Sequence, residues 1–342
     1  MAYTDIDKPS DYFSTKLYTG NGSTQSITGV GFQPDLVWWK SRGAAQDHQW
    51  YDVIRGVTKA IESNKTTAEY TQSNGLTSFN SDGFTVGDGT AGNASGDTFA
   101  SWNWKAGGTA SSNTDGSITS NVSANTTSGF SIVSYTGTGA NATVGHGLGV
   151  APKVVIIKSL SATYEWRSYF SPIGAGKYMV LNENYSEATA SNFMNNTAPT
   201  SSVFSLGSGT TPNGSGTTYI AYCFADVQGF SKFGSYTGNG SADGTFVYTG
   251  FKPAFVIIKQ TNFGNSWRMY DNKRSTFNVV TKELYPNTSD AEATTDKMDF
   301  VSNGFKFRTS ATNANESGSP YIYMAFAENP LVGTNNIPAT AR

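Results

Sequence analysis

The chain has 342 residues and a formal net charge of −2. Only 14% of its residues are charged, against roughly 25% in an average soluble domain. The absence of any long basic stretch excludes the electrostatic surface of a nucleic-acid-binding protein. Aromatic residues make up 13% of the chain and glycines number 37, a composition that suits strands better than helices.

Three further absences narrow the class of protein. No apolar run approaches the roughly 18 residues of a membrane span, so we expect no membrane insertion. Residues 1–5 lack the basic and then apolar pattern of a signal peptide. Cys223 is the single cysteine, so no disulfide can form within the chain. We therefore expect a chain that is made in a cytosol and held together by its core.

Three sequence blocks recur in the same order three times along the chain. The first, an aromatic block that ends in Thr-Gly, begins at Phe13, Phe130 and Phe230. The second starts with proline, continues as an apolar run and ends at Lys40, Lys158 and Lys259. The third covers residues 98–104, 218–224 and 320–326. The Thr-Gly ends predict turns, the apolar runs predict strands buried on both faces, and the third blocks alternate as strands do.

A tryptophan lies between the second and third blocks of each copy, and we expect these three to occupy one equivalent position. The third blocks supply three more aromatic residues at matching positions. An alternative role for such rings is a platform for sugars, but positions that exchange tryptophan for isoleucine or phenylalanine indicate packing. The predicted repeat core comprises Trp50, Trp166, Trp267, Trp104, Phe224 and Phe326.

These patterns predict an all-β fold of three tandem antiparallel β-sandwich domains, similar to one another and jelly-roll-like. The predicted organisation is an N-terminal arm (1–12), copy 1 (13–108), a Gly/Ser/Thr-rich linker (109–128), copy 2 (129–225), copy 3 (226–330) and a C-terminal tail (331–342). One short helix is expected at 52–62.

Candidate chemistry is scarce. His48 and His146 have no evident base or nucleophile beside them, and Cys223 lies on an apolar strand as a small core residue. No metal-ligand spacing is present. The sequence therefore predicts no catalytic residue, no cofactor and no metal.

Carboxylate pairs that meet only in space would escape this search. Asp52 and Asp271 occupy matching positions, but copy 2 has Phe170 there. The repeated feature is thus the framework rather than an acidic site.

Several motifs of copy 1 resemble those of a known protein family. The arm from Thr4 to Phe13 is followed by Leu17-Tyr18-Thr19-Gly20 and Gln33-Pro34-Asp35-Leu36-Val37-Trp38. Further on, Ser81-Asp82-Gly83-Phe84 leads to Ser101-Trp102-Asn103-Trp104-Lys105-Ala106-Gly107-Gly108. Copy 1 closely resembles a domain of unknown function found in virion proteins of marine tailed bacteriophages, such as those of cyanobacteria and Pelagibacter. Copies 2 and 3 share its landmarks. The resemblance implies a structural phage protein, made in the host bacterial cytoplasm, and supplies no catalytic residues.

We favour a non-enzymatic virion protein on the particle exterior that decorates the head. It would contact the capsid through an attachment arm, in which Asp5, Ile6, Pro9 and Tyr12 are the candidate residues. The alternative is a tail fibre or adsorption protein whose loops bind host surface glycan, and a more remote one is a polysaccharide-degrading enzyme. Other virion proteins and sister chains are the expected partners, since exposed sheet edges call for neighbours.

Overall fold

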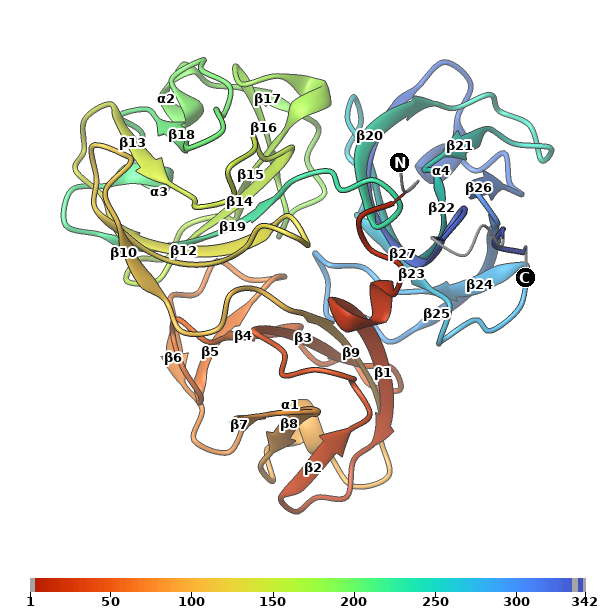
Figure 1. Cartoon of the computed structure of the whole chain (residues 1–342). Coiled ribbons are helices and arrows are strands. Elements are labelled where there is room, and N and C mark those ends of the chain that lie inside the picture. The colour runs from red at the N-terminus through yellow and green to blue at the C-terminus, as the bar shows by residue number, and fades with distance from the viewer. Residues whose placement is uncertain (1–3, 334–337, 341–342) are drawn as a thin grey trace.

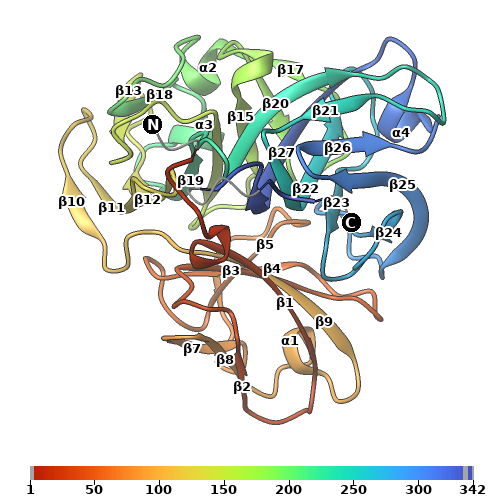
Figure 2. The same ribbon diagram turned by 45° about the vertical axis from the view of Figure 1, so that its right-hand side comes forward.

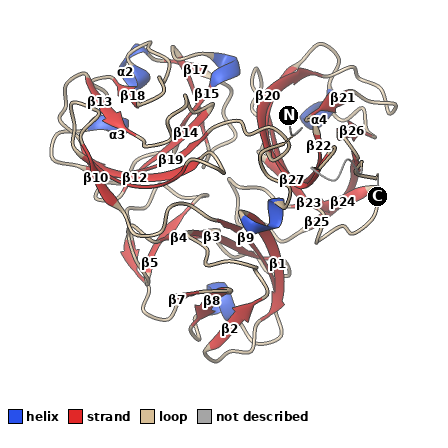
Figure 3. Ribbon diagram, viewed as in Figure 1, coloured by secondary structure: helices blue, strands red, loops and turns tan. Residues whose placement is uncertain are grey.

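The computed structural model describes residues 4–333 and 338–340 of the chain. Figure 1 shows three β-rich units around a common centre, and in Figure 3 the strands dominate while the helices are short turns. The expected all-β fold is confirmed. No helix in the described ranges is long and apolar enough to cross a membrane.

Unit 1 contains two antiparallel sheets and the short helix α1 (Thr90–Asn93). Its larger sheet has the order β1 (Phe13–Thr19), β9 (Thr98–Trp104), β3 (Leu36–Ser41), β4 (Gln49–Asp52), β5 (Lys59–Glu62) and β6 (Tyr70–Thr71). Its smaller sheet has the order β2 (Gln25–Thr28), β8 (Gly83–Val86) and β7 (Leu76–Asn80). The 3₁₀ turn η1 (Pro9–Asp11) precedes β1.

Unit 2 repeats this plan with a longer sheet. The order is β10 (Ser111–Asn113), β11 (Ser120–Asn125), β12 (Phe130–Thr136), β19 (Thr218–Phe224), β14 (Val154–Ser159), β15 (Arg167–Phe170), β16 (Lys177–Val180) and β17 (Ala188–Thr189). A second sheet pairs β13 (Ala142–Gly145) with β18 (Val203–Leu206). The helical turns are η2 (Ser171–Ile173), α2 (Ser191–Met194) and α3 (Thr210–Asn213).

Unit 3 contains two four-stranded sheets and the helix α4 (Thr312–Asn315). One sheet has the order β20 (Ser231–Thr237), β27 (Pro320–Pro330), β22 (Phe251–Gln260) and β23 (Arg268–Asp271). The other has the order β21 (Phe246–Tyr248), β26 (Gly304–Phe307), β25 (Ala293–Val301) and β24 (Val280–Glu283). The strand order β1-β9-β3-β4 therefore recurs as β12-β19-β14-β15 and as β20-β27-β22-β23.

Two local predictions are wrong. Segment 109–128 is not a plain linker, because β10 and β11 within it extend the larger sheet of unit 2 beyond β12, as Figure 2 shows. Segment 52–62 is not a helix, because β4 ends and β5 begins there and the two strands pair. In both segments sheet pairing overrides the weak local preference. Residues 1–3 of the predicted arm, and 334–337 and 341–342 of the predicted tail, lie outside the described residues.

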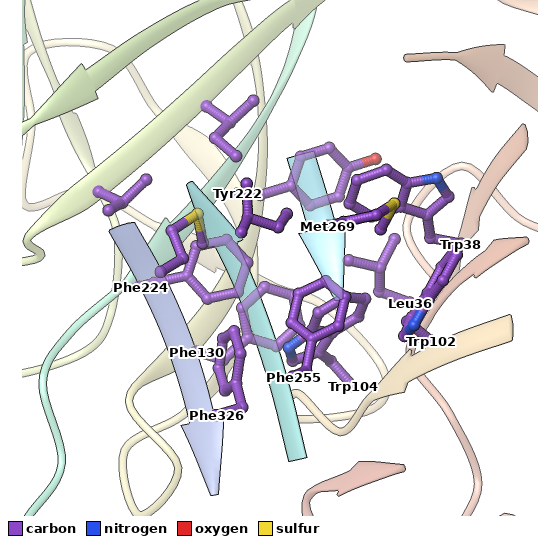
Figure 4. Close-up of a cluster of buried hydrophobic side chains, with 14 of the residues drawn as sticks. Leu36, Trp38, Trp102, Trp104, Phe130, Tyr222, Phe224, Phe255, Met269 and Phe326 are labelled. Atoms are coloured by element: carbon purple, nitrogen blue, oxygen red, sulfur yellow. The ribbon is translucent and has the colours of Figure 1, made fainter. Parts of the chain in front are cut away.

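In each unit the sheet that carries the apolar strand (β3, β14 or β22) is apolar on both faces. One face packs on the other sheet of the same unit, and each unit has its own cluster of buried side chains there. The other face meets the other two units in one shared core that contains residues of all three (Figure 4). In β19, Tyr219, Ala221 and Cys223 face the cluster within unit 2, whereas Ile220, Tyr222 and Phe224 face the shared core. The alternation predicted for the third blocks is thus confirmed.

Candidate functional site

The predicted attachment arm is packed against its own chain. Ile6 is 2% exposed and belongs to the shared core, and Pro9 is also buried. Tyr12 is half-buried, and its ring centre lies 6.0 Å from that of Phe230 in unit 3 in an edge-to-face arrangement. Of the four candidate residues only Asp5 is exposed. Attachment through Ile6 or Pro9 would require the arm to leave the core.

The six predicted core residues are all buried. Three of them form a triangle of aromatic rings at the centre of the molecule, one from each unit (Figure 4). The ring centres of Trp104 and Phe326 are 5.6 Å apart, those of Phe224 and Phe326 are 5.9 Å apart, and those of Trp104 and Phe224 are 6.4 Å apart. They are equivalent by register, since each lies opposite the residue two positions after the proline of its unit's second block: Leu36, Val154 and Phe255. Aromatic packing of this kind stabilises the junction of the units.

The expected equivalence of Trp50 with the other two tryptophans is wrong. Trp50 lies opposite Trp38 in the β3–β4 pair, and the residues at this register in the other units are Ser168 and Met269. The equivalent of Trp166 and of Trp267 is instead His48, two residues before Trp50. Residues two apart on a strand face the same way, so Trp50 still faces the shared core.

The three equivalent residues His48, Trp166 and Trp267 are held by the same kind of hydrogen bond. The backbone amides of His48, Trp166 and Trp267 each donate to an asparagine side chain, at 2.9, 2.8 and 3.0 Å. Each ring then reaches a neighbouring unit. Trp166 Nε1 donates to the Glu62 carbonyl of unit 1 at 2.9 Å, and Trp267 Nε1 donates to the Val180 carbonyl of unit 2 at 2.9 Å.

His48 completes this ring of contacts and acts as a packing residue. Its Nδ1 accepts a hydrogen bond from Trp38 Nε1 at 2.8 Å, so in the neutral imidazole the proton is on Nε2. The ring lies near the backbone of Tyr285 in unit 3, but its Nε2 has no hydrogen-bond partner among the described residues. Burial holds the pKa of His48 well below its ordinary value of 6.5. The residue is therefore neutral near pH 7.

A buried ion pair links units 1 and 2. Asp52 Oδ2 accepts from Arg55 Nε at 2.6 Å and from the Tyr222 hydroxyl at 2.7 Å. The side chains of Asp52 and Arg55 are 0% and 2% exposed. Arg55 also donates to the Trp50 carbonyl at 2.9 Å. The carboxylate thus has partners within unit 1 and from unit 2.

The same arrangement links units 3 and 1. Asp271 Oδ2 accepts from Arg274 Nε at 2.5 Å and from Trp102 Nε1 at 3.1 Å. Both members of the ion pair are fully buried. Trp102 occupies in β9 the register that Tyr222 occupies in β19.

The third junction, between units 2 and 3, replaces every member of this network with an apolar residue. Phe170 stands in place of the aspartate, Ile173 in place of the arginine and Met324 in place of the donor. Phe170 and Met324 line the same small void of about 10 Å³ in the shared core. Because the aspartate, the arginine and the hydrogen-bond donor are all replaced by apolar residues, this junction has no buried charge without a partner.

Three buried lysines end the apolar strands, and each binds backbone carbonyls only. Lys40 donates to the carbonyls of Ser41 and Ala44, and Lys259 makes the corresponding bonds to Gln260 and Phe263. Lys158 donates to a carbonyl of its own unit at 2.8 Å and to one of unit 1 at 2.9 Å. All three are 0% exposed. Burial lowers the pKa of Lys158 and of Lys259 to about 7, and that of Lys40 to about 8.

The remaining candidates for chemistry are also bound into the structure. His146 Nδ1 accepts from the Leu148 amide, and its Nε2 lies 3.1 Å from the Thr200 carbonyl. Cys223 is buried, which raises the pKa of its thiol to about 12 and makes it unreactive. The described residues contain no group of three or more His, Cys, Asp or Glu side chains that could hold a metal ion.

Three equivalent buried asparagines, one in each unit, were not predicted from the sequence, and we call them the asparagine triad. Asn93, Asn213 and Asn315 end the short helices α1, α3 and α4 and are 0% exposed. In each unit the side-chain oxygen accepts from the turn after the first strand, at 2.9, 2.8 and 3.0 Å. The side-chain NH₂ donates to two carbonyls on either side. The signal was present, since all three lie in the pattern Thr-x-x-Asn-x-Ser-Gly.

Four surface grooves of 380–490 Å³ open to solvent, and each is lined by one acidic residue. The largest, about 490 Å³, lies between β1 of unit 1 and unit 3. A glycosidase needs two facing carboxyl groups, and none of these grooves supplies the pair.

The comparison with protein families gives a match over almost the whole chain. Residues 8–330 match a domain of unknown function, DUF7483. The chain belongs to the DUF7483 family. The match spans all three units, so the DUF7483 domain as matched here is the three-unit body and not one of its units. No curated protein and no solved structure matches this DUF7483 chain.

Proposed function

We propose that this DUF7483 protein is a non-enzymatic structural protein on the exterior of a bacteriophage virion, where it decorates the head and contacts the capsid. The observation that carries the proposal is the fusion of three units with equivalent strand order around one shared core. A body of this kind presents three related surfaces around a common centre (Figure 1). A closed shell built by symmetry offers three-fold positions that such surfaces fit.

The placement of its polar groups supports a structural role. The buried carboxylates of Asp52 and Asp271, the two histidines and the three strand-end lysines all bind groups of the chain itself. Groups that act in catalysis need to face a site that substrate can enter. The acidic residues that line the grooves occur one to a groove, which speaks against the polysaccharide-degrading enzyme.

We further infer that the three units are divergent tandem copies of one ancestral unit, of the kind found in virion proteins of marine tailed phages. The inference is supported by the recurring registers, by the asparagine triad and by the three buried lysines. The sequence resemblance described above supports the phage source and a site of synthesis in the host bacterial cytoplasm. Capsid or tail proteins and sister chains are the proposed partners.

One groove favours a second function, host adsorption by a tail fibre or related protein that binds surface glycan. This groove has a volume of about 470 Å³ and lies where unit 2 continues into unit 3. Tyr248 lines it and is 54% exposed, beside the charged residues Asp226 and Lys232. An aromatic ring next to hydrogen-bonding groups is a surface that suits a sugar.

A reconstitution experiment tests the proposal. Phage particles that lack the chain would be incubated with purified chain, and heads and tails would then be separated. Saturable binding to heads, with a higher temperature of DNA release, is the expected result. Binding confined to tails would favour adsorption, and binding to neither would contradict a structural role on the particle.

A further inference from the structure

The equivalent strands β1, β12 and β20 differ in what covers their outer edge: the edge is covered in units 2 and 3 and open in unit 1. In unit 2, β11 pairs with β12 along five residues. In unit 3, the start of β20 is covered by its own chain, because Val227 bridges to Ser231 and the Asp226 carboxylate accepts from the Phe233 amide at 2.8 Å. In unit 1, β1 has β9 as its one neighbour among the described strands. Figure 2 shows β11 beside β12 and β1 at the border of its sheet.

The outer edge of β1 presents unpaired backbone groups. The carbonyl of Tyr12 and the amide of Gly20 both bond to the β9 side. In an antiparallel pair alternate residues face the neighbouring strand, so even-numbered residues of β1 face β9. The amides and carbonyls of Thr15 and Leu17 therefore point away from the sheet.

Unit 2 shows what these groups bind when a strand is present. The residues that correspond to Thr15 and Leu17 are Ile132 and Ser134, which lie opposite Ser123 and Asn121 of β11. The register of β11 on β12 therefore defines a register for a strand on β1.

The space for such a strand is present. The groove of about 490 Å³ runs along residues 13–17 of β1, with unit 3 as its other wall. Two buried atoms of residues that line it, Thr15 Oγ1 and Asn272 Oδ1, have no hydrogen-bond partner among the described residues. A native structure rarely leaves buried polar atoms unpaired, and an occupant of the groove is one source of a partner for these two atoms.

The charge of the groove indicates the chemistry of its occupant. Lys16 and Lys273 line it, and neither forms a direct ion pair with a described residue, although Lys16 is close enough to Asp82 to add to the backbone hydrogen bonds that lower the pKa of that carboxyl. The acidic residue of the groove, Glu328, already pairs with Lys252 at 3.4 Å. The groove thus offers two cations that are available to carboxylates.

We propose that β1 receives an extended, acidic segment of a partner protein as an added antiparallel strand, in the position that β11 has on β12. Main-chain hydrogen bonds to Thr15 and Leu17 provide affinity, and carboxylates beside Lys16 and Lys273 provide selectivity. That the segment belongs to another virion protein rests on the proposed function.

A peptide and amide exchange test the surface on the isolated chain. The probe has the β11 sequence of residues 118–125 with Val122→Glu, which places a carboxylate opposite Lys16 in the β11 register. At saturating peptide the amides of Thr15 and Leu17 should exchange at least about tenfold more slowly. The amide of Ser14, which already faces β9, should not change. The same peptide with Val122→Lys should bind about threefold more weakly or less, because like charges then lie opposite each other.

A matched pair of variants tests the role of the backbone. Thr15→Pro removes an amide that faces away from β9, so the native ladder keeps its bonds, and peptide binding should be lost. Thr15→Val keeps that amide and removes only the side-chain hydroxyl, so it should retain most of the binding that the proline variant loses. The proposal is overturned if the peptide protects neither Thr15 nor Leu17, or if the proline and valine variants bind equally.

Measurements on particles separate this inference from the proposed function. Absence of the chain from purified particles would contradict the proposed function and leave the peptide result intact. If the chain is present but Thr15 and Leu17 exchange as fast as in the isolated chain, strand addition on the particle is wrong. Slowed exchange of both amides in the particle is the expected result.

Discussion

The Tyr222 hydroxyl donates to Oδ2 of Asp52 across 2.7 Å, and both side chains are fully buried. The bond joins unit 2 to a carboxylate that also holds Arg55 of unit 1. The junction of units 1 and 2 therefore contains a buried carboxylate whose charge is neutralised by a buried arginine. Breaking such a pair costs more than replacing it, because the remaining charge stays buried.

Removal of the carboxylate should therefore destabilise the whole chain. We expect Asp52→Ala to lower the free energy of unfolding by about 3–5 kcal/mol, because Arg55 then lacks its partner in the core. Denaturant titration followed by tryptophan fluorescence measures the change.

The matched control copies the junction between units 2 and 3. The triple substitution Asp52→Phe, Arg55→Ile and Tyr222→Met reproduces the apolar set found there. It should cost less than Asp52→Ala alone, because no buried arginine is left without its aspartate. Glu69, whose carboxylate lies 3.5 Å from Arg55 Nη1, loses that cation, but its side chain is 21% exposed and so remains in contact with water. A triple variant that is less stable than the single one would contradict this account of the junctions.

The buried lysines predict that stability rises with pH above neutrality. In the unfolded chain Lys158 and Lys259 titrate near the ordinary value of 10.5, whereas burial lowers the pKa of both to about 7 in the folded chain. Between these values the unfolded state binds more protons, so the free energy of unfolding increases with pH. Each lysine adds at most about 1.4 kcal/mol per pH unit in this window.

Denaturant titrations at pH 7, 8 and 9 measure the trend. The variant Lys259→Met should show a shallower slope, because one of the titrating groups is gone. A free energy of unfolding that falls over this range would show that the lysines are not buried as described.

The asparagine triad predicts a local loss of stability. In Asn213→Ala the amide of Thr138 and the carbonyls of Ala140 and Gly207 lose their partner. Buried groups left unpaired cost about 1–3 kcal/mol each, so we expect a loss of about 2–4 kcal/mol and faster amide exchange at Thr138. The control Asn141→Ala removes an exposed asparagine of the same unit and should change stability by less than about 0.5 kcal/mol.

The shared core predicts that the three units unfold together. Calorimetry should show a single transition, and Trp104→Ala should lower its midpoint as a whole. Removal of a buried tryptophan costs about 3–5 kcal/mol, here from the triangle that Trp104 forms with Phe224 and Phe326. Two or three separate transitions, with Trp104→Ala moving only one, would mean that the units fold independently.

The sequence predicted the strands of the blocks well, because alternation and apolar runs depend on neighbours along the chain. The alternation of the third block places Trp102 and Trp104 on one face of β9, and both lie in the shared core. The pattern does not show which sheet packs on that second apolar face. A strand that is apolar on both faces can pack against a sheet of its own unit or of another unit.

The tryptophan alignment failed for a related reason. Tryptophan served as the landmark, but the true register is set by the strand pairs Trp38–Trp50 and Ile156–Ser168. A shift of two residues keeps a side chain on the same face of the strand, so the sequence pattern alone could not reveal it. The arm shows a further limit, because a short terminal segment carries no signal for the core into which Ile6 packs.

The copy number of the chain in purified particles tests the proposed function most directly. Quantitative mass spectrometry against the major capsid protein gives the ratio. A head decoration protein predicts about one chain per capsid subunit, or about one per three if each three-unit body occupies a three-fold position. A ratio equivalent to a few tens of chains per particle or fewer would contradict head decoration and indicate that the chain is a tail protein. Its absence from the particle would contradict the account.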